Sequence, residues 1–485
     1  MVQSKDCSGA DVKGSDTVLR LKALEVNSLE TEKPQKIDTP SVLQRETHNV
    51  SRADISENAL KVLYRLKKAG YDALLVGGGV RDLLLGRHPK DFDIVTDALP
   101  EDVSNLFRNS RLIGRRFRLV HVHFGKDIIE VATFRGHHGE SSDDENVGES
   151  DTITGDSPGK FSTNQFDSHI RDGMLIRDNV YGTREEDAWR RDFTINALYY
   201  NISDFSIIDY TGGLEDLNGK LIRMIGDPVQ WYREDPVRML RAIRFAAKLG
   251  FDIEPETESP IFQLGERLNA VPPARLFEEV LKLFLSGYAV QTFKLLRKYN
   301  LLGRLFPFTE NAFNTSSEGL SQAEAFIING LKNTDERIAQ GKPVTPAFLF
   351  AIMLWQPMKK MVNDSIQNGM RMLQAYQQAG VEIVSKQTEF VAMPKRYSIQ
   401  TREIWSMQPR LENRSGKRAY RILALPRFRA GYDFLMLRAQ VDEPDVISLC
   451  DWWTEFQNAG DHDRSALLRK VQAPRRRRKS RKNRA

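Results

Sequence analysis

Two aspartates, Asp91 and Asp93, open a short apolar run that ends at Val95. Residues i and i+2 of a strand point to the same face and lie about 7 Å apart. Carboxylates at that spacing repel each other, and a divalent cation makes the pair favourable. For an isolated Asp-x-Asp pair, a solvated strand edge is the alternative. A metal site is therefore predicted only if a second feature brings a ligand to the same place.

That second feature lies shortly before the aspartates, where the apolar residues 74–76 meet a glycine turn that starts at Gly77 and Gly78 and is followed by Arg81. Glycines at a strand–helix turn let backbone N–H groups approach phosphate oxygens, and an arginine adds charge-assisted hydrogen bonds. Alone, such a turn is more often an ordinary connection between a strand and a helix that binds no ligand. Its spacing matches neither the Walker motif nor the dinucleotide fingerprint. Beside Asp91 and Asp93, it predicts a phosphate cradle next to a site for two Mg2+ ions.

Two acids compete for the role of a third carboxylate. Glu130 is the one acid in the apolar run 128–132, where an unpaired charge is costly, although on an edge strand it could point to solvent. Asp192 follows Arg190 and Arg191 and could equally form an ion pair that caps a helix. These residues alone leave the choice open.

A third pattern combines acids with evenly spaced arginines. Glu234 and Asp235 precede a proline at a predicted helix start, and Arg238, Arg241 and Arg244 recur every three residues along that helix. A carboxylate and a guanidinium on a rigid helix offer an acceptor and donors to the edge of a base. On spacing alone, an N-capped helix with internal ion pairs is the stronger interpretation.

The elements that must position these residues are of two kinds. Ser56 is expected to cap a helix with Leu60, Leu63 and Tyr64 on one face, and Gly70 to end it. Short apolar runs at 73–76, 92–95, 119–124 and 128–134, with a helix starting near residue 100, predict a small α/β sheet domain. From residue 185 onward helical patterns dominate, among them 273–285, 290–299, 345–358 and 432–440.

Composition excludes several classes of protein. The chain has 485 residues, 40% of them hydrophobic and 28% charged, which fits a globular protein of roughly two to four domains. No stretch approaches the roughly 18 apolar residues of a membrane helix, so we expect no membrane partner and a cytoplasmic location. Cys7 and Cys450 are too few for a disulfide framework or a cysteine metal site.

Taken together, the motifs resemble those of the class II nucleotidyltransferases, the family that contains CCA-adding enzymes and bacterial poly(A) polymerases. The similar blocks are Leu-Val-Gly-Gly-Gly-Val-Arg-Asp, Asp-Phe-Asp, Glu-Val-Ala-Thr-Phe-Arg, Arg-Arg-Asp-Phe-Thr-Ile-Asn-Ala-Leu, and the segment 234–251. They cover residues 55–300 strongly. The poly(A) polymerase branch is favoured by Phe92, by the pair His137 and His138, by Trp452 and Trp453, and by the segments 115–124, 272–279, 345–351 and 416–419.

The resemblance implies an α/β nucleotidyltransferase domain of the polymerase beta type, followed by a mostly α-helical array. It implies that Asp91 and Asp93 bind the catalytic metal ions, and it favours Asp192 over Glu130 as the third catalytic acid. The implied nucleotide-binding residues are Gly77, Gly78, Arg81, Arg191, Asp235, Arg238 and Arg241. Of these, Gly78 and Arg81 would hold the triphosphate, and Asp235, Arg238 and Arg241 would select the base and grip its phosphates.

Five parts are expected along the chain. They are a disordered arm (1–52), a catalytic domain (53–200) with an acidic insert (139–165), a helical nucleotide-selecting and RNA-binding neck domain (201–300), a helical C-terminal RNA-binding domain (301–460) and a basic disordered tail (461–485). Within the tail, residues 475–485 carry eight bases and no acid, although the net charge of the whole chain is only +6. We expect this segment to contact RNA phosphates; a solvated end or a targeting signal is the alternative.

The implied reaction is template-independent transfer of AMP from ATP to RNA 3′ ends, with release of pyrophosphate, in RNA processing and decay. It would use two Mg2+ ions, with Mn2+ as an alternative metal. A CCA-adding tRNA nucleotidyltransferase, which uses CTP as well as ATP, is the nearest other interpretation. A non-catalytic RNA-binding protein on a transferase fold is more distant, and the intact Asp91, Asp93 and Arg81 argue against it.

Overall fold

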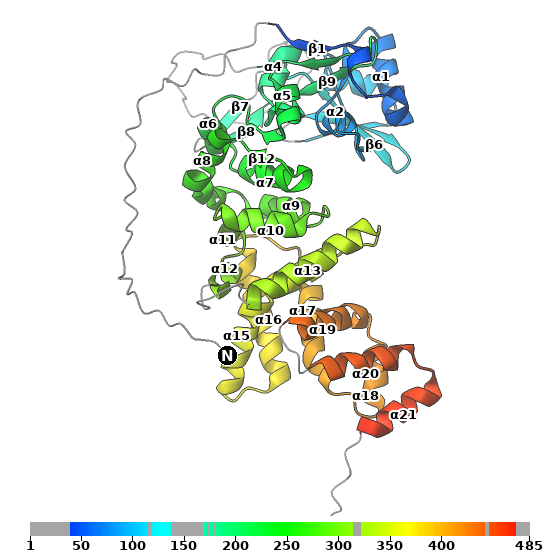
Figure 1. Ribbon diagram of the computed structural model, residues 1–485, viewed down its shortest axis with the longest axis vertical. Coiled ribbons are helices and arrows are strands. Elements are labelled where there is room, and N and C mark those ends of the chain that lie inside the picture. The colour runs from blue at the N-terminus through cyan, green and yellow to red at the C-terminus, as the bar shows by residue number, and fades with distance from the viewer. Residues whose placement is uncertain are drawn as a thin grey trace, which may run out of the picture. The chain divides into compact units, whose positions relative to one another are not determined.

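A mixed sheet of eight strands forms the first part of the fold (Figure 1). The computed structural model describes residues 39–114, 118–136, 168–171, 174–178, 180–313, 322–441 and 446–471. The strand order is β1-β10-β9-β2-β3-β6-β5-β4. The strands are β1 (Ser41–Leu43), β2 (Ala73–Val76), β3 (Asp93–Thr96), β4 (Ser110–Ile113), β5 (Leu119–Phe124), β6 (Asp127–Thr133), β9 (Leu198–Asn201) and β10 (Ile207–Asp209). The hairpin β7 (Ser168–Arg171) and β8 (Met174–Asp178) and the parallel pair β11 (Leu221–Ile222) and β12 (Asp252–Ile253) lie outside this sheet.

The four strands expected from the apolar runs are confirmed, β2 and β5 at the predicted bounds and β3 and β6 shifted by one residue. Helices α1 (Glu57–Lys68) and α3 (Pro100–Leu106) pack on one face of the sheet. The Ser56 hydroxyl caps α1 by accepting a hydrogen bond from the N–H of Ala59, at 3.1 Å. The predicted apolar face of α1 is correct for Leu63, which is buried, and wrong for Tyr64, which is 43% exposed. Val62 and Leu66 are buried in the core as well.

The chain enters the sheet earlier than expected. The prediction of a disordered arm up to residue 52 is wrong for residues 41–43, which form the edge strand β1 and pair antiparallel with β10. Val50 is 1% exposed and belongs to the main core, and the His48 ring contacts the carbonyl oxygen of Phe205 at 2.8 Å. Scattered single apolar residues carried no periodic signal here, because this short strand is held by its neighbours.

Helices make up most of the chain after β10, which confirms the expected fold class. Two further helices, α2 (Gly78–Leu84) and α4 (Arg184–Trp189), precede β10. After β10 the chain forms α5 (Gly213–Gly219), α6 (Pro228–Glu234), α7 (Val237–Leu249), α8 (Pro255–Leu264), α9 (Pro273–Phe284) and α10 (Ala289–Lys298). Further along lie α11 (Leu302–Leu305), α12 (Pro307–Phe313), α13 (Gln322–Ala339), α14 (Pro346–Met353), α15 (Trp355–Gln367), α16 (Met372–Thr388), α17 (Lys395–Glu412), α18 (Lys417–Leu423), α19 (Phe428–Val441), α20 (Ile447–Asn458) and α21 (Asp461–Val471).

Three further expectations need correction. The single helix expected over 345–358 is two helices, α14 and α15, which meet at Leu354. Every residue of α14 except Phe348 is buried, so this helix has no polar face from which to find the break. The boundary at residue 200 falls inside β9, and β10 still belongs to the sheet. The tail expected to be disordered from residue 461 begins with helix α21, which buries Leu467 and Leu468.

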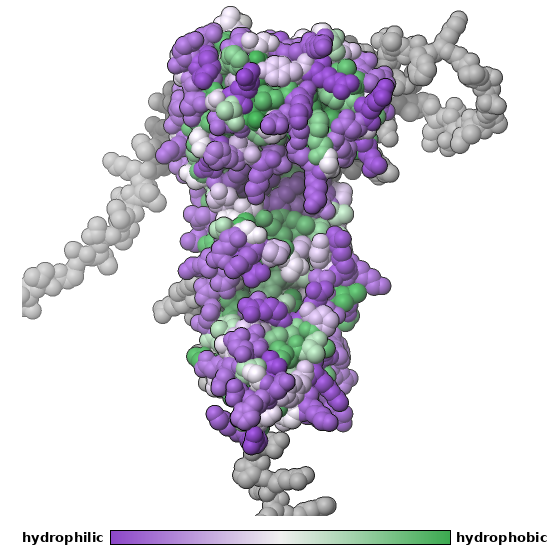
Figure 2. Space-filling model, turned by 90° about the vertical axis from the view of Figure 1, so that its right-hand side faces the viewer, coloured by the Kyte–Doolittle hydropathy of each residue, from purple (hydrophilic) through white to green (hydrophobic). Residues whose placement is uncertain are grey.

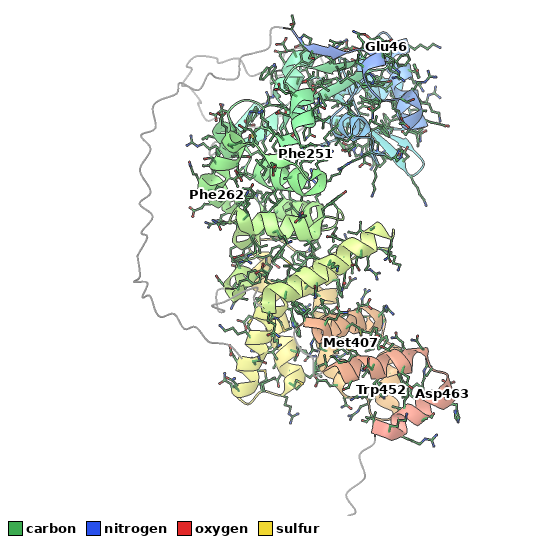
Figure 3. All side chains as sticks on the ribbon, viewed as in Figure 1. Glu46, Phe251, Phe262, Met407, Trp452 and Asp463 are labelled. Atoms are coloured by element: carbon green, nitrogen blue, oxygen red, sulfur yellow. The ribbon has the colours of Figure 1, made fainter. Side chains whose placement is uncertain are left out.

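The described residues form a large main core and a second core near the C-terminal end. The second core contains Met407 and Trp452, both labelled in Figure 3, together with Trp453 and Phe456. A smaller cluster, which includes Leu74, Val76 and Tyr199, covers the sheet face opposite α1. Within the described residues, no helix is long and apolar enough to cross a membrane. The acidic insert (139–165), Arg115 to Phe117, His137, His138 and the basic residues 475–485 lie outside the described residues.

Candidate active site

The glycine turn and the aspartates meet because β2 pairs antiparallel with β3, with Val76 opposite Asp93. Gly77 follows directly and has φ of +76°, a backbone conformation that favours glycine. A Cβ atom at Gly77 would lie 3.7 Å from an Nη1 atom of Arg191 and 3.9 Å from Oδ2 of Asp93. The turn therefore faces both a carboxylate and a guanidinium, as expected for a phosphate site beside a metal site.

Glu130 lies in register with Asp93 on the neighbouring parallel strand β6. On the other side, His121 of β5 is the direct partner of Glu130, and its Nε2 atom lies 3.2 Å from a carboxylate oxygen of Glu130. Asp93, Glu130 and His121 therefore form one row across three strands. Val120 and Val122 point to the opposite, buried face.

The carboxylates make this row electrostatically unfavourable without a cation. Burial, and then the negative charges of Glu130 and Asp91, raise the pKa of Asp93 to about 6 against the opposing effect of Arg191. Asp91 itself is exposed. No group of three or more metal-ligating side chains is assembled within the described ranges. A site of one or two carboxylates, completed by water and substrate phosphates, is nevertheless the usual protein environment of Mg2+, so these residues fit that ion.

Asp192 has a different environment. Its Oδ1 atom accepts hydrogen bonds from the N–H of Phe193 at 2.9 Å and from Asn196 at 3.1 Å, and its Oδ2 atom accepts one from Arg241 at 2.6 Å. Burial alone would raise the pKa of Asp192, but Arg241, Asn196 and Arg238 hold it below its usual value. Both Asp192 oxygens are thus engaged by neighbouring donors, whereas Glu130 is in register with Asp93. The assignment of Asp192 as the third catalytic acid stays a prediction.

Arg191 and Arg81 are each held by acids that the sequence did not single out as partners. Arg191 donates to Asp187 at 2.9 Å and to the hydroxyl of Tyr199 at 3.1 Å. Arg81 is 2% exposed and donates to Asp82 at 2.7 Å and to Asn196 at 2.5 Å. Lys248 of α7 also donates to Asp82, at 2.9 Å, which ties α7 to the helix that follows the glycine turn. Both guanidiniums are thereby fixed near the turn.

The residues expected to select the base lie at the start of α7. The guanidinium carbon of Arg238 lies 3.9 Å from the centre of the Trp231 ring, and its Nη1 atom is buried without a hydrogen-bond partner. Burial lowers the pKa of Arg238. Asp235 accepts a hydrogen bond from Arg275 of α9 at 2.7 Å. The structure thus places Asp235 and Arg238 together, and Arg238 keeps an unused donor.

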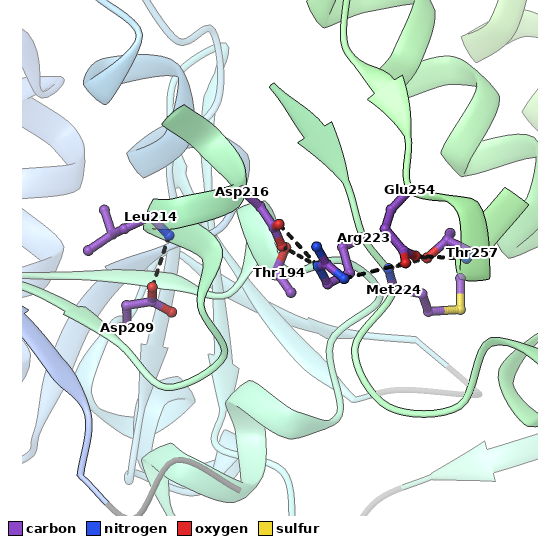
Figure 4. A network of polar contacts seen from close by, with 8 residues as sticks. All are labelled: Thr194, Asp209, Leu214, Asp216, Arg223, Met224, Glu254 and Thr257. Atoms are coloured by element: carbon purple, nitrogen blue, oxygen red, sulfur yellow. Dashed lines mark hydrogen bonds and ion pairs between the residues drawn. The ribbon is translucent and has the colours of Figure 1, made fainter. Parts of the chain in front are cut away.

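A polar network fixes the segment that carries Arg191 and Asp192 (Figure 4). The Thr194 hydroxyl donates to Asp216 of α5 at 2.7 Å. Arg223 forms ion pairs with Asp216, at 3.1 Å, and with Glu254, at 3.4 Å. Glu254 in turn accepts a hydrogen bond from the N–H of Thr257 at 2.8 Å. The network connects the sheet to α8. On the face shown in Figure 2, a hollow with hydrophilic walls interrupts the surface.

Sequence reasoning missed several residues that hold the site together. They are Asp187, Tyr199, Trp231, His121 and Arg275. Arg275 lies 40 residues from Asp235, so one sequence gives no sign of that pair. The other four lie within nine residues of Arg191, Arg238 or Glu130, and the spacing of Asp187 and Arg191, four residues apart, could have indicated an ion pair on one helical turn. Arg244 was noted only because arginines recur every three residues at 238, 241 and 244. That spacing does indicate that the three side chains lie near one face of the helix.

Fold and site together define a nucleotidyltransferase of the class that comprises poly(A) polymerases and CCA-adding enzymes. Three family profiles match the chain: Poly A polymerase head domain over residues 73–223, probable RNA and SrmB-binding site of polymerase A over 250–313, and polymerase A arginine-rich C-terminus over 368–485. Poly(A) polymerase I of Escherichia coli O6:H1 is 49% identical over 468 residues, which cover 94% of this chain and 95% of that protein. Poly(A) polymerase I of Haemophilus influenzae is 44% identical, with 89% and 91% covered. The chain belongs to the poly(A) polymerase I family.

CCA-adding enzymes are more distant. The enzyme of Lactobacillus helveticus is 36% identical over 242 residues, covering 50% of this chain and 53% of that protein. Among solved structures, a CCA-adding enzyme in an apo form matches with a TM-score of 0.57 at 19% identity, covering 89% of this chain and 91% of that one. At that identity the likeness concerns the fold alone, and it confirms the expected nucleotidyltransferase architecture.

Proposed function

We propose that the protein is a template-independent poly(A) polymerase that transfers AMP from ATP to RNA 3′ ends and releases pyrophosphate. The observation that carries this function is the 49% identity to a poly(A) polymerase I over nearly the full length of both chains. The likeness to the CCA-adding enzyme of Lactobacillus helveticus spans half of the chain, which favours polyadenylation over CCA addition. The intact aspartates and arginines of the site argue against a non-catalytic RNA-binding protein.

The carboxylates have a defined task in this proposal. Asp91 and Asp93, with Glu130 beside them, would hold Mg2+, and Mn2+ suits the same oxygen ligands. The metal supplies Lewis acidity, which makes the RNA 3′ hydroxyl a better nucleophile and neutralises charge on the leaving pyrophosphate. The new bond joins the 3′ oxygen to the α-phosphorus as the bond to pyrophosphate breaks, so no covalent enzyme intermediate is required.

The arginines and Asp235 would position the nucleotide. Arg191 and Arg81 lie beside the glycine turn and would bind triphosphate oxygens, with Gly77 and Gly78 allowing a close approach. The free donor of Arg238 would face a ring nitrogen of adenine, while its stacking on Trp231 holds the guanidinium in place. Asp235, oriented by Arg275, supplies a nearby acceptor for an amino group. Arg241 donates to Asp192 at 2.6 Å and would lie near the same phosphates.

One assay tests the function. Purified protein with Mg2+ is offered ATP or CTP together with either an unstructured RNA oligonucleotide or a tRNA that lacks its CCA end. We expect long tails from ATP alone on the oligonucleotide. A product that stops after CCA on the tRNA would instead identify a CCA-adding enzyme.

A matched pair of variants tests the site. Asp91→Ala should abolish nearly all transfer, whereas Asp54→Ala, which removes an exposed acid outside the site, should not. Circular dichroism should show that both variants fold. A fully active Asp91→Ala protein would contradict the assignment of the metal site.

A further inference from the structure

Three guanidinium groups converge on one phenyl ring beside the candidate site. The ring of Phe245 on α7 has the guanidinium carbons of Arg81, Arg241 and Arg244 at 5.2, 5.5 and 4.8 Å from its centre. The ring is 8% exposed and packs edge-on against Phe193. Three like charges this close repel one another unless acids or a bound anion compensate them.

Two of the three charges are compensated by the protein. Arg81 pairs with Asp82 and Arg241 pairs with Asp192, at 2.7 and 2.5 Å. Arg244, by contrast, forms no hydrogen bond or ion pair with any residue that the structure describes, and its Nε atom is buried without a partner.

The two acids that attract Arg244, Glu279 and Asp192, are each paired with another base. Glu279 of α9 attracts it, but Lys282 donates to the Glu279 carboxylate at 2.8 Å. Burial and the charge of Arg241 lower the pKa of Arg244 to about 10. A guanidinium is a poor group to bury without a partner, because its lost hydration is not replaced. One positive charge in this cluster therefore lacks a counter-charge.

We propose that Arg244 binds the β- or γ-phosphate of the incoming ATP and so makes the enzyme favour a triphosphate over a monophosphate. This inference rests on the proposed function and assigns a further nucleotide-binding residue to it. Arg244 lies six residues beyond Arg238, about 9 Å further along the helix axis. It therefore lies away from the base-selecting end of α7 and beside Arg81, whose Nη2 atom would be 3.4 Å from a Cβ atom at Gly78.

The experiment compares the affinities of ATP and AMP, since only ATP offers the β- and γ-phosphates. Binding of a non-hydrolysable ATP analogue and of AMP is measured by calorimetry for the full-length protein with Mg2+. Arg244→Gln should weaken the analogue about ten- to hundredfold, the usual effect of losing a charge-assisted hydrogen bond, and change AMP by less than about twofold. Arg238→Gln should weaken both ligands in parallel.

Two further variants separate this role from a structural one. Arg244→Lys keeps the charge and should recover part of the lost affinity for the analogue. Arg233→Gln removes an exposed arginine from α6 and should change neither affinity. Equal weakening of the analogue and AMP by Arg244→Gln would overturn the proposal and indicate a structural role. Unchanged analogue affinity together with a raised KM for RNA would also overturn it, since Arg244 would then contact the primer.

The outcome is independent of the tailing assay. If the protein adds CCA to tRNA, the proposed function fails, but the dependence of ATP discrimination on Arg244 can still be observed. If it makes poly(A) and Arg244→Gln leaves the ratio of ATP to AMP affinity unchanged, the function stands and this inference fails.

Discussion

Asp93, the partly buried acid of the candidate site, carries a cost in stability when it is ionised. Its carboxylate is partly buried beside Glu130 and Asp91, so its pKa in the folded protein is about 6 rather than 3.8. The folded state then binds a proton more tightly than the unfolded state. Between pH 3.8 and about pH 6 the folded protein therefore holds more protons than the unfolded protein, so the free energy of unfolding falls as the pH rises. Above about pH 6 the ionised Asp93 destabilises the metal-free protein.

Asp93→Asn should therefore stabilise the metal-free protein while abolishing transfer. A shift of this size corresponds to about 2 to 3 kcal/mol in the free energy of unfolding at pH 8. Urea unfolding in EDTA at pH 8 should show this gain, and at pH 4 it should nearly vanish. Asp91→Asn, which changes an exposed acid, is the control and should gain little. A variant no more stable than the natural protein at pH 8 would refute the argument.

His121 illustrates a residue that acts through another. The side chain of Glu130 is 52% exposed, and the His121 ring contacts its carboxylate at 3.2 Å and orients it. His121→Ala should raise the Mg2+ concentration for half-maximal transfer about tenfold, as loss of a residue that orients a metal ligand commonly does. The KM for ATP at saturating Mg2+ should stay unchanged, and His121→Gln should recover part of the effect. His123→Ala, on the same strand opposite Ile128, should leave the Mg2+ requirement unaltered.

At the scale of elements, the sequence predicts what is local. The strand, turn and helix around Gly77 could be predicted because an apolar run and glycines stand next to each other in the sequence. The pair Asp91 and Asp93 could be predicted because the two acids are two residues apart. Asp192 was preferred to Glu130 on motif similarity alone, and nothing in the sequence indicated the strand register that brings Glu130 beside Asp93. Such register, like the pairing of Asp235 with Arg275, depends on contacts between distant segments.

The edge strand β1 gives an element-scale prediction about the N-terminus. Removing residues 1–38 leaves every described contact in place and should leave the thermal midpoint unchanged. Removing residues 1–52 also strips β1 and the buried Val50. Burial of one valine and the strand hydrogen bonds together suggest a loss of about 3 to 5 kcal/mol. Equal thermal midpoints for the two truncated proteins would show that β1 contributes nothing to stability.

At the scale of the whole molecule, charge is distributed unevenly between the folded part and the C-terminal end. The net charge of +6 is smaller than the eight positive charges of residues 475–485, so the rest of the chain carries −2. The rest of the chain is therefore close to neutral overall, and in the candidate site most arginines are paired with acids, as Arg81 and Arg241 are. Long-range attraction of a polyanion must then depend on the C-terminal segment more than on the sheet domain.

Deleting residues 475–485 should therefore weaken RNA binding and reduce its dependence on salt, without changing the KM for ATP. For single-stranded nucleic acid each phosphate contact contributes about 0.7 to the slope of log affinity against log salt, so eight charges can account for a change of up to about 5 to 6. The deletion spares α21, whose Leu467 and Leu468 are buried in the second core, so folding should be unaffected. Replacing the eight bases with glutamine at constant length is the matched control and should give the same loss, because charge rather than chain length attracts the RNA. An unchanged salt slope in both variants would indicate that the helices before residue 475, and not residues 475–485, bind the RNA.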